Sequence, residues 1–277
     1  KQFHFIGIGG IGMSALARIL IQKNTQISGS DLNRNKSCVA LEKLGADIKI
    51  GHDASYIKKG MTVVYTTAVK DDNPELQEAK LQECSLIHRS DLLKSLMSEQ
   101  QILNVAGTHG KTTTSSLLAA VMVRAGFDPS YAIGGILADF ESNGSNGKGK
   151  FFVAEADESD GSFIKYPSHA AIVTNLEKEH MDHYGSEEAL EGAFENFMTK
   201  VSHKELLFTC GDDSALRKVY QGPAIWYGFG EQCSLRAESY RQKGWRSFFN
   251  VNFEGKKYQD IEITEQLAKN YMKPWIL

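Results

Sequence analysis

The run Gly107-Thr-His-Gly-Lys-Thr-Thr113 constrains the fold of this chain more than any other feature of the sequence. It follows an apolar, strand-like run, Ile102–Ala106, and opens a helical pattern over Thr112–Arg124 that stops before Gly126. Glycines let a backbone curl until several N–H groups point into one concavity, next to the partial positive charge of a helix N-terminus. The strand, loop and helix together predict an α/β domain with a binding site for a polyphosphate.

Lys111 and Thr112 supply the side-chain chemistry that such a loop needs. A lysine at this place can reach terminal phosphates, and the hydroxyl of the next residue can ligate Mg²⁺. The loop is a compact variant, because Val105 stands where the general GxxxxGK[ST] pattern has its first glycine. A glycine-rich turn that only joins a strand to a helix remains the alternative.

Strand-like and helical patterns alternate along most of the chain, which predicts parallel sheets with helices on their faces. The strands predicted in the first hundred residues are Phe3–Ile8, Gln26–Ser28, Ala46–Ile50 and Thr62–Thr66, and the helices are Gly12–Gln22, Cys38–Leu44 and Pro74–Glu83. The second series starts at Ile102 and includes the strands Phe151–Ala156 and Ala170–Asn175.

A polar stretch at Met97–Gln101 separates these two series and marks the predicted domain boundary. We therefore expect a Rossmann-like parallel-sheet domain over residues 1–98 and a P-loop ATPase-like α/β domain over residues 99–277. The glycine-rich stretch Glu141–Lys150 predicts a surface loop. After Leu206 the pattern changes to short β-like runs, such as Ser247–Phe253 and Lys257–Ile263.

Composition excludes several classes of protein. The net charge is −3 with acids and bases interspersed, so there is no electrostatic footprint for nucleic acid or an anionic membrane. The four cysteines are far apart, which argues against a disulfide framework or a zinc site. No apolar run is long enough to cross a bilayer, and the first residues lack a signal-peptide layout. A cytoplasmic enzyme fits best.

Acidic side chains and a histidine follow two further predicted strands. Glu155 lies near the end of Phe151–Ala156 and is followed by Asp157-Glu-Ser-Asp160, and His180 follows Ala170–Asn175. Ligands of open parallel sheets bind beyond the carboxyl ends of the strands, so these groups are expected beside the phosphate loop. Taken singly, each acid is as readily a helix cap or a solvated residue, and His180 a structural histidine.

A second glycine loop, Gly7-Ile-Gly-Gly-Ile-Gly12, lies between the first predicted strand and helix. Asp31 follows the next strand, 19 residues after Gly12, which matches a dinucleotide-binding fingerprint. An NAD-dependent oxidoreductase is therefore one interpretation. The loop itself indicates only a diphosphate at a helix N-terminus, which UDP supplies as well as NAD does. A turn needed for helix–sheet packing is the structural alternative.

Four motifs in order resemble the Mur ligases. They are HFIGIGGIGMSALA at 4–17, AGTHGKTTT at 106–114, AEADESD at 154–160 and TNLEKEHMD at 174–182, and the resemblance extends from about Phe3 to Ile263. The first motif most resembles the family members that join L-alanine to UDP-N-acetylmuramate. It differs from that of the related ligase that recycles murein peptides.

The resemblance implies ATP and Mg²⁺ as cofactors and UDP-N-acetylmuramate and L-alanine as substrates. In the second domain, ATP phosphates would contact Gly107, Thr108, His109, Gly110, Lys111, Thr112 and Thr113. The Mg²⁺ ligands would be Thr112, Glu155 and His180. Catalytic roles are implied for Lys111, Glu155, His180, Asn175, Glu158 and Ser159.

In the first domain, the resemblance places the sugar nucleotide on the glycine loop. The diphosphate would face Gly9, Gly10, Ile11, Gly12, Met13 and Ser14, with Ser30 and Asp31 toward the uridine and Thr66, Thr67 and Ala68 adding contacts. The implied reaction, a step in peptidoglycan precursor synthesis, passes through an acyl phosphate. That intermediate forms on the lactyl carboxylate and is attacked by the amine of L-alanine.

The C-terminal part of the sequence departs from the family pattern. The family continues after the strand corresponding to Lys257–Ile263 with a Gly-x-His-Asn segment and a third domain, and Thr264–Leu277 contains neither. We therefore expect these 277 residues alone to bind ligands weakly or to lack turnover. A non-catalytic nucleotide-binding module is the remaining interpretation.

Overall fold

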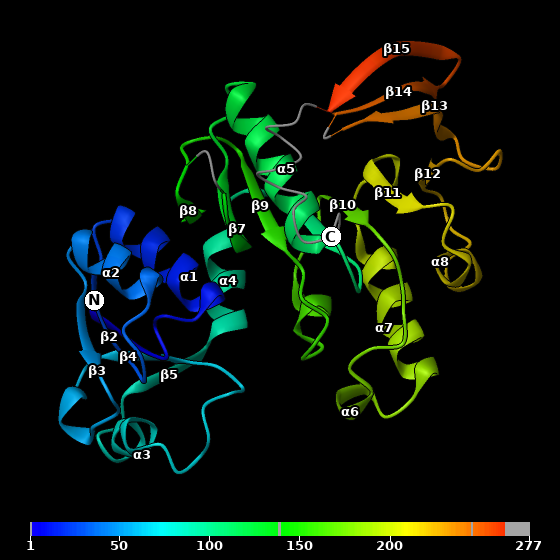
Figure 1. The fold of residues 1–277 in the computed structure, drawn as a ribbon. Coiled ribbons are helices and arrows are strands. Elements are labelled where there is room, and N and C mark those ends of the chain that lie inside the picture. Colours follow the sequence, from blue (N-terminus) through cyan, green and yellow to red (C-terminus); the bar gives the residue numbers. More distant parts are fainter. Residues whose placement is uncertain (1, 138–139, 245, 264–277) are drawn as a thin grey trace. The chain divides into compact units, whose positions relative to one another are not determined.

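The computed structural model describes residues 2–137, 140–244 and 246–263 (Figure 1). The chain folds into two compact units. The first contains residues 1–100, 126–136 and 142–152, and the second contains residues 101–125, 137–141 and 153–277. Residues 126–136 and 142–152, which follow the boundary predicted from the sequence, thus group with the first unit.

The first unit is built on a parallel sheet in the order β3-β2-β1-β4-β5. Its strands are β1 (Gln2–Ile6), β2 (Gln26–Asp31), β3 (Asp47–Ile50), β4 (Thr62–Tyr65) and β5 (Ser85–His88). The chain moves outward from β1 to β3 and then returns to the other side of β1 at β4. This reversal creates a topological switch point, where open sheets of this kind bind their ligands.

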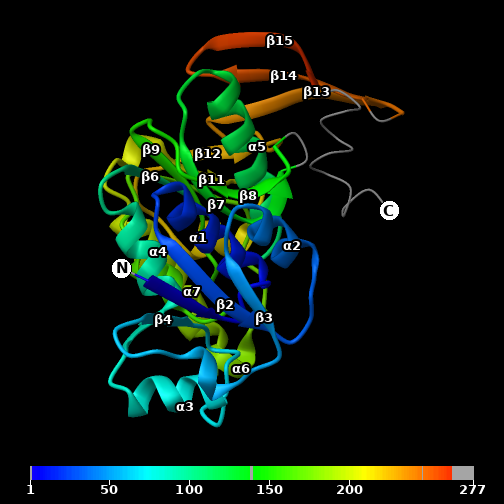
Figure 2. The same cartoon turned by 90° about the vertical axis from the view of Figure 1, so that its left-hand side faces the viewer.

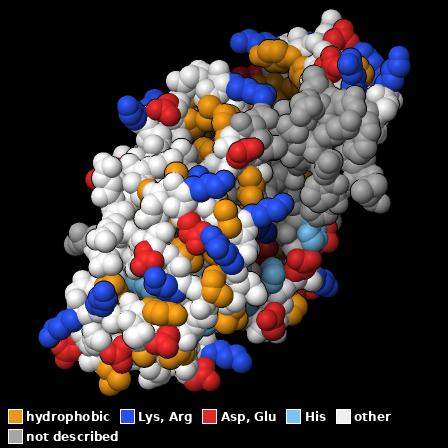
Figure 3. Space-filling model, turned by 60° about the vertical axis from the view of Figure 1, so that its left-hand side comes forward, with side chains coloured by type: hydrophobic (Ala, Val, Ile, Leu, Met, Phe, Trp, Pro, Cys, Tyr) orange, Lys and Arg blue, Asp and Glu red, His pale blue; other side chains and the backbone are white. Residues whose placement is uncertain are grey.

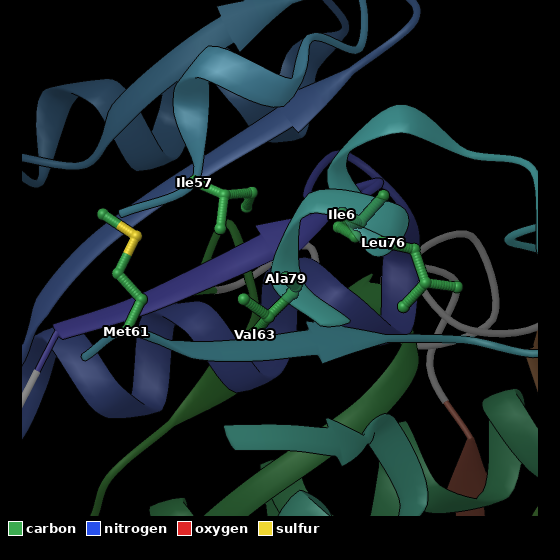
Figure 4. Packing of buried hydrophobic residues seen from close by; sticks show 6 residues of the cluster. All are labelled: Ile6, Ile57, Met61, Val63, Leu76 and Ala79. Carbon is green, nitrogen blue, oxygen red and sulfur yellow. The ribbon is translucent and has the colours of Figure 1, made fainter. Parts of the chain in front are cut away.

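Helices cover both faces of this sheet. They are α1 (Ile11–Gln22), α2 (Lys36–Lys43), α3 (Pro74–Leu81) and α4 (Arg89–Met97), with a 3₁₀ turn at Ala54–Tyr56. Figure 2 shows α1 and α4 on one face and α3 on the other. Beneath α3 lies an apolar cluster formed by Ile6, Ile57, Met61, Val63, Leu76 and Ala79 (Figure 4). Pro74 at the first helical position and the Asn73 side chain, which accepts from two backbone N–H groups, fix where α3 begins.

The stretch Glu141–Lys150 corrects one prediction, because part of it is a buried strand rather than a surface loop. Strand β8 (Ser142–Ser145) packs against α1 within the first unit. The amide Nδ2 of Asn143 donates to the carbonyl oxygen of Ile11 at 2.6 Å and to Ser14 Oγ at 2.9 Å. A Cβ at Gly144 would lie 2.6 Å from the carbonyl oxygen of Ala15. Gly144 thus permits close contact between the backbones of β8 and α1, and the Asn143 side chain forms buried hydrogen bonds to α1.

Within the described residues, a second sheet contains ten strands in the order β15-β14-β13-β12-β11-β10-β6-β9-β7-β8. Besides β8 they are β6 (Gln101–Ala106), β7 (Ser130–Leu137), β9 (Phe151–Glu155), β10 (Ala170–Val173), β11 (Leu207–Cys210), β12 (Ile225–Gly228), β13 (Leu235–Lys243), β14 (Arg246–Phe253) and β15 (Lys256–Ile263). Strands β6, β10, β11 and β12 run parallel, whereas β13, β14 and β15 form an antiparallel meander.

The helices of the second unit follow its parallel strands. They are α5 (Lys111–Arg124), α6 (Met181–Tyr184), α7 (Glu187–Lys200) and α8 (Ser214–Val219), with 3₁₀ turns at Ser162–Lys165 and Lys204–Leu206. Phe163, Phe194 and Phe197 pack together in the core, with the Phe163 ring centroid 5.3 Å from each of the other two. The predicted fold class, two α/β units built on parallel strands, is confirmed.

The surface agrees with the composition of the chain. Basic and acidic side chains are intermixed on the face shown in Figure 3. In the part of the chain that the structure describes, no helix has the length and apolarity needed to span a membrane. All four cysteines are free thiols. The segment Thr264–Leu277 lies outside the described residues.

Candidate active site

The phosphate loop lies between β6 and α5, and both of its glycines have backbone conformations that other residues rarely adopt. Gly107 has φ +133° and Gly110 has φ +80°. A Cβ at Gly107 would overlap the hydroxyl of Thr174, whereas a Cβ at Gly110 would meet nothing within 4 Å. The first glycine is therefore required for both space and conformation, and the second for conformation alone.

The end of β10 holds this loop in place. Strands β6 and β10 end in register, with Ala106 paired to Val173, so the residues after Val173 lie against the loop. The Asn175 side chain contacts the backbone of His109 twice, accepting from its N–H at 2.7 Å and donating to its carbonyl oxygen at 3.0 Å. The hydroxyl of Thr174 donates to the same carbonyl oxygen at 2.6 Å. Asn175, expected in the reaction site, thus has both polar side-chain atoms on the loop.

Lys111 folds back over its own loop. Its Nζ donates to the carbonyl oxygens of Gly107 at 2.6 Å and Thr108 at 3.1 Å. It also contacts both carboxylate oxygens of Glu158, at 3.0 and 2.8 Å. Burial raises the pKa of Glu158, and the hydrogen bond and charge of Lys111 act in the opposite direction. The charge of Lys111 thus offsets the negative charge of Glu158, whose side chain is only 1% exposed.

Oxygen ligands suited to Mg²⁺ meet at the start of α5. The hydroxyl of Thr112 donates to the two carboxylate oxygens of Glu155 at 2.9 and 3.2 Å. His180, which adopts φ +57°, has its Nε2 at 3.7 Å from Glu158. Within the described residues no group of three or more acidic, histidine or cysteine side chains is arranged to hold a metal. Mg²⁺ commonly takes one or two protein ligands and completes its shell with water and phosphate, so Thr112 and Glu155 fit it.

The remaining predicted residues of this unit lie around the same loop. The backbone N–H of Ser159 donates to Asp157 at 3.1 Å, which forms the turn after β9. His109 Nε2 lies 3.4 Å from both Glu177 and Glu179.

An open pocket of about 440 Å³ adjoins the loop and is lined by His109, Gly110, Thr113, Thr114, Thr174, Asn175 and Glu177. Hydroxyl, amide and loop backbone groups thus border a space beside a helix N-terminus.

The first glycine loop is tied to the end of β2. The N–H groups of Gly7 and Ile8 donate to the carbonyl oxygen of Ser30 at 2.8 and 2.9 Å. The N–H of Gly9 donates to Asp31 at 2.9 Å, and a Cβ at Gly9 would lie 2.6 to 2.9 Å from the side chains of Asn35, Cys38 and Asp31. The fingerprint therefore forms a strand–loop–helix unit whose acidic residue braces the loop.

The predicted substrate-binding residues of the first unit differ in exposure. Gly10, Ile11, Thr67 and Ala68 are exposed, and Gly12 and Thr66 are half-buried. Met13 and Ser14 are buried in α1, where the Ser14 hydroxyl donates to the carbonyl oxygen of Ile11 at 3.0 Å. Ser30 is fully buried. Exposed positions thus concentrate on the loop tip and after β4.

Two family models match the chain. The model described as "Mur ligase family, catalytic domain" matches residues 2–101, and that described as "Mur ligase middle domain" matches residues 105–267, more than half of the chain. The chain belongs to the Mur ligase family. The two matched segments meet at residues 101–105, close to the boundary predicted from the sequence.

Two curated Mur ligases show how far the similarity extends. The UDP-N-acetylmuramate–L-alanine ligase of Protochlamydia amoebophila is 48% identical over 95% of this chain and 58% of its own length. The ligase of the same name from Aquifex aeolicus is 41% identical over 95% of this chain and 59% of its own length. This Mur ligase chain therefore spans less than two thirds of the length of these two curated relatives.

Solved structures agree with these relatives. The UDP-N-acetylmuramate-alanine ligase of Thermotoga maritima matches with a TM-score of 0.85 and 29% identity, covering 95% of this chain and 60% of its own. A ligase of Neisseria meningitides, named for UDP-N-acetylmuramate and L-alanyl-γ-D-glutamyl-meso-diaminopimelate, matches at 0.81 and 26%, covering 96% and 90%. Neither the oxidoreductase nor the non-catalytic interpretation has support among these relatives.

The structure also brings together residues of this Mur ligase that the sequence analysis did not single out. Glu75, buried at the start of α3, contacts Ser30 and also His52, which follows β3. Tyr184 donates through its hydroxyl to the carbonyl oxygen of Glu158 at 2.7 Å. His52 follows a glycine just after a predicted strand. This position was the one feature of the sequence that could have identified His52 as a candidate site residue.

Proposed function

We propose that the protein carrying this chain joins L-alanine to UDP-N-acetylmuramate at the expense of ATP, as a cytoplasmic step in peptidoglycan precursor synthesis. The observation that carries this proposal is the 48% identity to a ligase of that name over 95% of the chain. The two glycine loops, one in each unit, supply a separate anion site for each of two phosphate-bearing substrates.

The second unit would bind ATP. The N–H groups of residues 107–113 suit a polyphosphate, and Lys111 would exchange its contact with Glu158 for the terminal phosphates. Thr112 and Glu155 would hold Mg²⁺, with His180 as the further ligand expected from the family. When bound, the cation offsets negative charge on the phosphates and on the attacking carboxylate. Asn175 and Thr174 would keep the loop in its binding conformation.

The reaction consists of two displacements. The lactyl carboxylate of the sugar nucleotide attacks the γ-phosphorus of ATP, and ADP leaves, which gives an acyl phosphate. The α-amine of L-alanine then attacks the acyl carbon, and inorganic phosphate leaves. Lys111 lowers the repulsion between the carboxylate and the triphosphate, which otherwise opposes the first displacement. The first unit would contribute by binding the uridine diphosphate and so fixing the other end of the substrate.

A phosphate-release assay on the full-length protein tests this proposal. The complete mixture holds ATP, Mg²⁺, UDP-N-acetylmuramate and one amino acid from a panel of L-alanine, glycine, L-serine and D-alanine. We expect rapid phosphate release with L-alanine that requires the sugar nucleotide, with a new amide in the product by mass spectrometry. Release that is independent of the sugar nucleotide, or equal for every amino acid, would contradict the proposal.

A further inference from the structure

A buried carboxylate lies beneath the carboxyl edge of the first sheet. Glu75 is 0% exposed and accepts three side-chain hydrogen bonds. One oxygen accepts from His4 Nε2 at 2.6 Å and from Ser30 Oγ at 2.9 Å, and the other from His52 Nδ1 at 2.6 Å. These partners come from β1, from β2 and from the segment after β3. One side chain of α3 thus fixes groups on β1, on β2 and on the segment that follows β3.

The hydrogen-bond partners determine the proton positions in this network. Burial by itself would raise the pKa of Glu75, but the hydrogen bonds from His4, Ser30 and His52 outweigh it and lower the pKa. A carboxylate can only accept, so the histidine nitrogens that face Glu75 each carry a hydrogen. The second nitrogen of His4 is also engaged, because Nδ1 lies 3.0 Å from Ser28 Oγ.

His52 differs from His4 because it retains a free ring nitrogen. Its Nδ1 contacts Glu75 and lies 3.0 Å from Ser30 Oγ, while Nε2 has no hydrogen-bond partner within the described residues. The side chain is 19% exposed, against 1% for His4. A neutral imidazole whose Nδ1 carries the hydrogen presents Nε2 as an acceptor. His52 is therefore an oriented acceptor whose tautomer Glu75 determines.

His52 lies on the edge of the sheet where a nucleotide is expected. The N–H of the preceding residue, Gly51, donates to the carbonyl oxygen of Asp31 at 2.8 Å, which ties the segment to the end of β2. In a sheet of this order, the diphosphate lies at the first glycine loop and the ribose at the acidic residue after the second strand. The base then extends toward β3, where His52 follows the strand.

We propose that His52 accepts a hydrogen bond from the base of the sugar nucleotide and that Glu75 is the positioning residue that makes this possible. The inference rests on the proposed function, in which the nucleotide is a uridine diphosphate. Uracil carries a donor, N3–H, where cytosine carries an unprotonated nitrogen. An acceptor fixed at Nε2 therefore favours uracil and leaves two acceptors facing each other when cytosine takes its place.

The energetics of the network agree with an orienting role. A buried carboxylate is a weak source of stability, because taking its charge out of water offsets most of the gain from its hydrogen bonds. An apolar side chain at position 75 would fill the space without that cost, but it could not fix a tautomer. Only the carboxylate can accept from all three donors, which lie on β1, on β2 and after β3.

Calorimetric titration of the full-length protein with UDP and with CDP at pH 8 tests this assignment. We expect the wild type to favour UDP by about tenfold or more, in line with rejection of a ligand that leaves a polar group unpaired. His52→Ala should weaken UDP binding by about tenfold and remove the preference for UDP, as expected for loss of one hydrogen bond. Glu75→Gln should remove or reverse the preference, because an amide N–H facing Nδ1 places the ring hydrogen on Nε2. The double variant should bind UDP no more weakly than His52→Ala.

His4→Gln is the matched control, because His4 contacts the same carboxylate but is buried away from the edge. It should lower the denaturant midpoint and leave the ratio of UDP to CDP affinity unchanged. If His52→Ala and Glu75→Gln keep the wild-type ratio, the network is structural and the inference is overturned. Should Glu75→Gln fail to fold, the ratio for His52→Ala decides alone. A wild type that binds ATP but neither UDP nor UDP-N-acetylmuramate would overturn the proposed function itself. That result is distinct from an unchanged ratio of UDP to CDP affinity in the variants.

Discussion

Lys111 is held both by its own loop and by the carboxylate of Glu158, so replacing it changes stability as well as chemistry. Lys111→Met should reduce phosphate release by on the order of 10²–10³-fold, the usual cost of losing a donor aimed at developing charge. It should also lower the free energy of unfolding by about 3–5 kcal/mol, because Glu158 is left buried and unpaired. Calorimetry should show UDP-N-acetylmuramate affinity within about twofold of the wild type, a margin below 0.5 kcal/mol.

A double variant separates these two effects. Adding Glu158→Gln to Lys111→Met removes the unpaired charge, so the denaturant midpoint should recover while phosphate release stays low. Recovery of activity together with stability would show that Lys111 serves the fold alone. A parallel loss of UDP-sugar affinity and ATP affinity in Lys111→Met would contradict the assignment of each ligand to its own unit.

The two glycines of the phosphate loop provide a matched pair of substitutions. Gly110→Ala should cost about 1–2 kcal/mol of unfolding free energy, since an alanine there suffers only the left-handed backbone conformation. Gly107→Ala should cost about 2–5 kcal/mol, because its methyl group would also overlap the Thr174 hydroxyl. Urea denaturation and ATP titration of both variants measure the difference. Equal costs would mean that β10 moves away freely and does not hold the loop.

At the scale of elements, β8 shows how a polar strand can be bound by hydrogen bonds rather than by apolar contact. Asn143→Ala should lower the unfolding free energy by about 1–3 kcal/mol, because Ile11 and Ser14 lose a buried partner. Asn146→Ala, three residues later on a half-buried position, should change it by less than about 0.5 kcal/mol. Chemical denaturation of the two variants compares them. Similar losses would show that the Asn143 amide contributes nothing specific.

The elements that the sequence predicted are those with a clear apolar period. Strand β6 and helix α5 were predicted within a residue of their bounds, since Ile102–Ala106 is apolar apart from Asn104 and Gly126 ends the helical pattern. Strand β8 was missed because its burial depends on Gly144 and Asn143 meeting α1, some 130 residues earlier in the chain. Strand β5 and helix α4 were missed because Ser85–Met97 mixes polar and apolar residues without a strict period.

The candidate site was predictable to a similar extent. The loop motif pointed to Lys111 and Thr112, and a position near the end of a predicted strand pointed to Glu155. The structure brings Thr112 and Glu155 into contact. The network around Glu75 could not be predicted, because its members are single residues 22 to 71 positions apart. Hydrogen bonds of that range depend on the register of β1, β2 and β3, which no local pattern encodes.

At the scale of the whole molecule, Glu75 makes the stability of the first unit depend on pH. Its pKa is lowered by folding from the usual 4.5, so its contribution is present above that value and is lost as the pH falls through the folded-state pKa. The difference in unfolding free energy between the wild type and Glu75→Gln should therefore be smaller below about pH 4 than at about pH 5. Urea titrations across this range measure it, and a gap that widens on acidification would contradict the sign.

The path of the chain has a consequence for biosynthesis. The first unit is not finished at residue 100, because residues 126–136 and 142–152 belong to it, after the chain has contributed residues 101–125 to the second unit. During synthesis, α1 can therefore pack against β8 only after residues 142–145 have left the ribosome. A truncation after residue 101, where the first matched segment ends, would leave the side of α1 that packs against β8 exposed to solvent. A fragment meant to contain the whole first unit should therefore extend at least to Phe152.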